Sequence, residues 1–80
     1  MAELDNVART AKHILFILTQ EQRLRAGDGM SPLTLQHDMN RHQIPQDLQQ
    51  EALEYALAQG WLQKGPYGEW QLTETGFALD

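Results

Sequence analysis

The stretch GWLQKGPYGEWQLTETG, residues 60–76, decides the fold of this chain. Before Gly60 the apolar residues recur at helical spacing, whereas after it they alternate with polar residues, which is typical of strands. WLQK and EWQLT are therefore predicted to pair as a two-stranded hairpin around GPYG, a turn with glycine at both ends. Trp70 and Leu72 share one face of this hairpin, and we expect that face to lie toward the helices.

Thr73 follows the hairpin and is expected to cap a last helical turn, ETGFALD, over residues 74–80. In this turn, Phe77 and Leu79 are the large apolar residues. We expect both side chains to fold back onto the core.

The first helix is predicted over residues 3–25, with one apolar stripe at three- and four-residue spacing. The stripe consists of Leu4, Val7, Ala11, Ile14, Leu15 and Leu18. Phe16 and Ile17 fall off this stripe. They either widen the buried face or form a second face that contacts a partner, in which case Phe16 and Ile17 are the predicted dimer contact.

The glycines of AGDGM end the first helix, and a second helix is predicted over residues 33–42. Its start has two alternatives: Ser31 before Pro32 could begin it, or LTL could be a short strand with Thr34 as the cap. The third helix, PQDLQQEALEYALAQ, begins at Pro45 and is closed by a glycine. Only QIP separates these two helices, which predicts a tight helix-turn-helix corner.

The composition, with 41% hydrophobic residues and no cysteine, indicates one small globular domain over residues 1–80. Disulfides and thiolate metal ligands are therefore excluded, and a reducing, cytoplasmic location is the simplest expectation. The charged N-terminus lacks a signal-peptide core. The longest apolar run, HILFIL, is far shorter than the roughly 20 residues that span a bilayer, so no membrane partner is expected.

The net charge of −5 is unevenly distributed along the chain. Residues 1–44 contain five acidic and five basic residues, whereas residues 45–80 contain six acidic residues and Lys64 alone. All the excess negative charge therefore lies in the half of the chain that contains the third helix and the hairpin.

No arrangement for catalysis or cofactor binding can be assembled from these residues. His37 and His42 are five residues apart, unlike the four-residue spacing of a zinc-binding helix, and no cysteine could complete a site. The glycine pairs of GDG and GPYG are turn signals and do not form a phosphate-binding loop. We therefore expect a non-catalytic protein without a metal or cofactor.

The order helix, turn, helix, corner, helix, hairpin resembles the winged helix-turn-helix family, in particular bacterial transcriptional regulators. ALEYALAQGWL is similar to the end of a recognition helix followed by the wing, and WQLTETG to the apolar-Leu-Thr-x-x-Gly exit of the wing. The resemblance implies a mainly α fold with a small β-hairpin: three helices plus a wing of two or three strands. Asp38 and Met39 depart from the family pattern, which usually has a Leu-Ala pair there.

The resemblance implies that the third helix enters a major groove of DNA. Gln46, Gln49 and Gln50 would then read bases, because glutamine can bond adenine through two hydrogen bonds. Flanking phosphates or the minor groove would meet a second set of residues: Arg41, His42, Lys64 and Tyr67.

The local charge favours a different partner. Residues 45–59 contain no Lys or Arg but include Asp47, Glu51 and Glu54, whereas a strong DNA binder contacts about 6–10 phosphates with cations. The favoured interpretation is a regulatory protein-interaction or dimerisation module of transcription-factor type, with Tyr67 as a contact at the hairpin tip. The alternative is a sequence-specific DNA-binding regulator that works as a homodimer through the third helix and the wing.

Overall fold

Helix α1, Ala2–Phe16, continues directly into one π-helical turn, η1, Ile17–Glu21, in the computed structural model, which describes residues 2–79. Ile14, Leu15, Ile17 and Leu18 are all buried, so the helix presents a broad apolar face to the core. Ile17, predicted as a dimer contact, is fully buried within the single chain and offers no surface to a partner. Phe16 lies on the opposite side of the helix and is 48% exposed.

The first helix ends at Glu21, four residues before the predicted end. The N–H of Gln22 donates to the carbonyl of Ile17 at 3.0 Å, which closes the wide π turn. Arg23 then adopts a positive φ of 56°, a left-handed conformation that stops the helix. The side chain of Leu4, the first residue of the predicted stripe, lies outside the described part of the chain.

Helices α2, Pro32–Arg41, and α3, Gln46–Gln59, form the predicted corner. The start of α2 follows the first of the two alternatives, because Ser31 is the N-cap and its Oγ accepts the N–H of Thr34 at 3.2 Å. LTL is helical rather than a strand. Helix α3 ends at Gly60, whose φ of 77° confirms the predicted glycine cap.

The predicted hairpin is confirmed as β2, Leu62–Lys64, and β3, Trp70–Leu72, which pair antiparallel with Leu62 opposite Leu72. A third strand, β1, Gly29–Met30, lies in the segment predicted only as a turn and pairs antiparallel with β3. The strand order is β1-β3-β2. Mainly helical with a small three-stranded antiparallel sheet, the chain has the predicted winged-helix layout.

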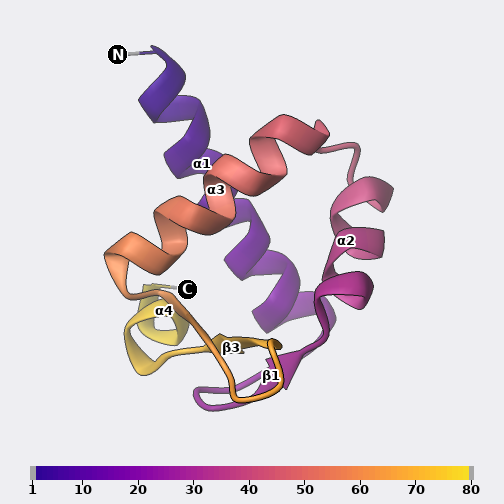
Figure 1. The fold of residues 1–80 in the computed structure, drawn as a ribbon. Helices are drawn as coiled ribbons and strands as arrows, with labels where there is room; N and C mark the ends of the chain where they lie inside the picture. The colour runs from indigo at the N-terminus through magenta and orange to yellow at the C-terminus, as the bar shows by residue number, and fades with distance from the viewer. Residues whose placement is uncertain (1, 80) are drawn as a thin grey trace.

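The core lies where α1 and α3 cross and where both meet the sheet (Figure 1). It is formed by apolar side chains from α1, η1, α2, α3, β2 and β3, among them Ala11, Ile14, Leu35, Met39, Ala52, Ala56, Leu62, Trp70 and Leu72, and Met30 of β1 packs against it. Within residues 2–79, none of the helices has the length and apolar character that a membrane crossing requires.

The short helix α4, Glu74–Leu79, begins with the predicted cap, since the Oγ1 of Thr73 accepts the N–H of Gly76 at 3.0 Å. Phe77 and Leu79 are 43% and 47% exposed, so the prediction that they fold back onto the core is wrong. The buried residue of α4 is Gly76, which packs against the backbone of Trp61, and this close approach turns Phe77 outward. Residue 80, the end of the predicted turn, lies outside the described residues.

Gly76→Ala is expected to destabilise the fold by about 1–3 kcal/mol, because the new methyl group overpacks a closed site. A Cβ at this position would collide with the carbonyl oxygen of Trp61 and lie 3.1 Å from Leu72 Cδ1. Urea unfolding followed by circular dichroism measures the loss. Helix propensity alone predicts that Gly76→Ala stabilises the fold. Thr75→Ala, at an exposed position of the same helix, is the control. A Gly76→Ala variant as stable as the control would contradict the close packing.

Candidate functional site

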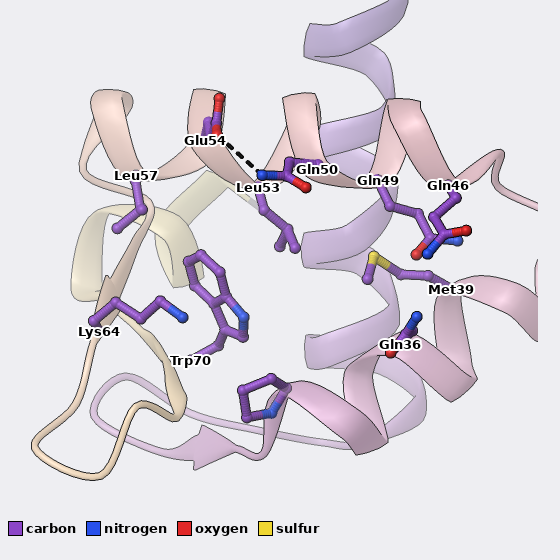
Figure 2. A pocket seen from close by; sticks show the side chains of 11 residues that line it. Gln36, Met39, Gln46, Gln49, Gln50, Leu53, Glu54, Leu57, Lys64 and Trp70 are labelled. Carbon is purple, nitrogen blue, oxygen red and sulfur yellow. Dashed lines mark hydrogen bonds between the residues drawn. The ribbon is translucent and has the colours of Figure 1, made fainter.

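An open groove of about 400 Å³ lies between the exposed side of α3, the helix α2 and the hairpin of β2 and β3, which we call the wing (Figure 2). We call it the α3 groove. Its apolar lining comes from all three elements: Pro32, Met39, Leu53, Leu57 and Trp70. Leu57 is among the exposed large hydrophobic residues, so part of this apolar surface is open to solvent.

The rim of the α3 groove is polar and includes one carboxylate. Gln46, Gln50 and Glu54 border it from α3, and the amide of Gln50 lies 3.4 Å from the carboxylate of Glu54. Asp47, Glu51 and Glu54 are exposed at four- and three-residue spacing, which places them along one side of the helix. We call these three residues the acidic edge.

Gln49, predicted to read bases, has a structural role. Its side chain is only 4% exposed. The amide nitrogen donates to the carbonyl of Ile44 at 2.6 Å and to Oδ1 of Asn40 at 2.8 Å. The amide therefore ties α3 to the corner and to α2. The sequence contained a signal for this, because Gln49 lies at three- and seven-residue spacing from the buried Ala52 and Ala56.

Arg41 and His42, predicted to meet phosphates, are bound to carboxylates of the same chain. The guanidinium of Arg41 lies 2.9 Å from Glu21 and 3.1 Å from Asp38, and the imidazole Nε2 of His42 lies 2.7 Å from Glu21. Hydrogen bonds to Asp38 and then to Glu21 raise the pKa of Arg41 above its usual value. These contacts join the end of η1 to the end of α2.

The departure at Asp38 and Met39 from the family pattern has a local explanation. Asp38 is buried and accepts a 2.7 Å hydrogen bond from the amide of Gln22 in addition to its contact with Arg41. Met39 belongs to the core. Met39 thus keeps the apolar role of the pair, whereas Asp38 is a carboxylate hydrogen-bonded to Gln22 and Arg41.

The wing presents one aromatic residue to solvent and holds its single cation against another. Tyr67, at the tip, is 92% exposed, as its predicted contact role requires. The Nζ of Lys64 lies 4.1 Å from the ring centroid of Trp70, a cation–π contact beside the α3 groove (Figure 2). Of the seven residues predicted to bind DNA or a partner, the structure therefore brings Gln46, Gln49, Gln50 and Lys64 together at the groove, and Gln49 is the buried one.

Comparisons with known proteins give no match to a family model, to a curated protein or to a solved structure. The chain is thus a small α+β domain whose layout is compatible with a winged helix. Its function has to be argued from the chemistry of the α3 groove.

Gln49→Ala is expected to lower the free energy of unfolding by about 1–3 kcal/mol, because the buried carbonyl of Ile44 loses its donor. Gln50→Ala, at the exposed neighbouring position, should change it by no more than about 0.5 kcal/mol. Urea denaturation of both variants measures the difference. Equal effects at the two positions would mean that the Gln49 amide does not hold the corner.

The wing tip is expected to loosen in acid. Hydrogen bonds from the backbone N–H of Glu69 itself and from that of Tyr67 hold the pKa of Glu69 below its ordinary value of 4.5. Because the pKa of Glu69 is lower in the folded protein than in the unfolded chain, its carboxylate stabilises the folded turn fully at a pH above the unfolded-state pKa. This stabilisation is lost as the pH falls through the folded-state pKa. The amide proton of Tyr67, followed by NMR, should shift with a midpoint below 4.5. Glu69→Gln should abolish that titration.

Proposed function

We propose that this chain is a non-catalytic, regulatory protein-interaction module of transcription-factor type that binds a segment of a protein partner in the α3 groove. One observation carries the proposal: the helix face that would meet DNA in a winged helix bears an apolar groove lined by Glu54, and Asp47 and Glu51 are exposed on the same helix. Apolar surface open to solvent marks interaction sites. Carboxylates repel the phosphates of DNA and attract cationic side chains.

The groove defines the chemistry of the partner segment. Leu53, Leu57 and Trp70 supply an apolar surface that accepts a large apolar or aromatic anchor. The acidic edge beside them favours Lys or Arg at neighbouring positions of the same segment. An amphipathic helix with one aromatic anchor and flanking cations combines both features, and a helix lying in a groove is a common mode of recognition.

DNA binding by a homodimer is the competing function. Gln46 and Gln50 border the groove and remain accessible from solvent, as base reading would require. Lys64 is then the one basic residue that lines the groove. A dimer would have two such lysines but also two acidic edges. Its groove cations would still be far fewer than the roughly 6–10 phosphate contacts of a strong DNA binder.

Fluorescence anisotropy of a labelled mixed-sequence duplex of about 30 base pairs separates the two functions. We expect no binding at low or near-physiological salt. Tight binding at low salt that falls steeply as salt is added would overturn the proposal in favour of a DNA regulator. The charge-reversed variant Glu51→Lys/Glu54→Lys should gain salt-dependent binding, which would show that the assay detects cations on this face.

A labelled helical peptide with one phenylalanine and cations at three- and four-residue spacing is the positive probe. We expect it to bind the chain, and a peptide with glutamates in place of the cations not to bind. Glu54→Lys should weaken the cationic peptide about tenfold, or about 1.4 kcal/mol. Glu74→Lys changes the net charge equally but lies outside the groove. Equal weakening by both variants, or no binding of the cationic peptide, would contradict a docking site in the α3 groove.

A further inference from the structure

The exposed face of α1 carries cations around an aromatic residue. Arg9, Lys12, His13 and Phe16 are all exposed, and their three- and four-residue spacing places them on the side of the helix opposite the core. The ring of His13 also meets the ring of His42 edge-on, with 5.0 Å between the centroids. Within the part of the chain that the structure describes, Arg9 and Lys12 make no ion pair. We call these four residues the basic stripe.

The basic stripe and the α3 groove lie on opposite sides of the molecule. Helices α1 and α3 cross, as Figure 1 shows, and their buried residues belong to the same core. Their exposed faces therefore point away from each other. The stripe cannot reach the groove of its own chain, whereas it is free to reach the groove of a second copy.

The two surfaces match in chemistry and in length. The groove offers an apolar lining beside Glu54, the last residue of the acidic edge, and the stripe offers Phe16 beside Arg9 and Lys12. Asp47 to Glu54 and Arg9 to Phe16 each span seven helical steps, about 10 Å of helix length. Two helices laid side by side can therefore place cations opposite carboxylates while Phe16 contacts the groove.

We propose that the occupant of the α3 groove is the basic stripe of a second copy of this chain. The inference rests on the proposed function, because it takes the groove to be a docking site. Because the two surfaces lie on opposite sides of the molecule, two copies cannot exchange both contacts with each other, so the contact is heterologous. Copies therefore join head to tail into chains or larger rings rather than stopping at a dimer.

The association is expected to be weak and sensitive to salt. One helix face on one groove is smaller than the roughly 1,200–2,000 Å² of a standard stable interface. Exposed charge pairs are screened beyond about 10 Å at 0.1 M salt. The average mass should therefore rise with protein concentration at low salt and fall back toward the monomer when salt is added.

Sedimentation velocity of the wild type and of two single-surface variants tests the inference. Arg9→Glu/Lys12→Glu removes the stripe, and Glu51→Lys/Glu54→Lys removes the groove edge. Each variant alone should be a monomer, and circular dichroism should show an unchanged fold because all four positions are exposed. A mixture of the two should associate again, because the intact stripe of one variant fits the intact groove of the other and the two charge-reversed surfaces complement each other as well.

Two further variants control for net charge. Arg23→Glu/Arg25→Glu makes the same charge change as the stripe variant outside the basic stripe, and it should still associate. A chain carrying the stripe and groove-edge substitutions together has its charges exchanged, so it should regain self-association. Loss of association in the Arg23/Arg25 variant would mean that net charge, rather than the stripe, controls the mass.

The outcomes separate this inference from the proposed function. A wild type that stays monomeric at low salt, or whose mass stops at a dimer, overturns the head-to-tail contact. A mixture of the two single-surface variants that stays monomeric overturns it as well. In each case the proposed function still stands if the cationic peptide binds the groove and Glu54→Lys weakens it. Failure of that peptide overturns both.

Discussion

The buried amide of Gln49 is the contact on which the arrangement of the functional face depends. By donating to the carbonyl of Ile44 and to the side chain of Asn40, it joins the start of α3 to the corner and to α2. The direction of α3 relative to α2 sets the width of the groove between them. A polar residue in the middle of the glutamine-rich segment is thus structural, while Gln46 and Gln50, on either side of it in sequence, border the groove.

A second set of contacts pairs the side chains at the end of α2 with carboxylates of the same chain. Arg41 bonds to Glu21 and Asp38, and His42 bonds to Glu21, so neither side chain is unpartnered as a phosphate contact would require. These carboxylates come from η1 and from α2 itself. The chain therefore uses Arg41 and His42 to hold two elements together, and the exposed face of α3 keeps only its acidic side chains.

The parts of the fold that follow local rules could be predicted from the sequence. The hairpin, the Thr73 cap and the Gly60 terminus depend on residues next to one another in the chain. Strand β1 could not be predicted in the same way, because it has two residues and exists only by pairing with β3. The buried roles of Gln49 and Ile17 depend on neighbours that the corner and the π turn bring together. The sequence therefore predicted which residues lie at the groove better than it predicted which of them are structural and which are accessible.

Because α1 packs on α3, the uneven charge distribution along the sequence gives the molecule one basic side and one acidic side. The apolar faces of the two helices meet inside, so the cations of one and the carboxylates of the other lie on opposite outer sides. A symmetric pairing through two α1 faces would bring Arg9 and Lys12 of both copies together, and pairing through two α3 faces would oppose two acidic edges. Like charges in close contact destabilise an interface. The pairing that joins unlike charges is therefore α1 of one copy on α3 of the next, and that geometry does not close on two copies.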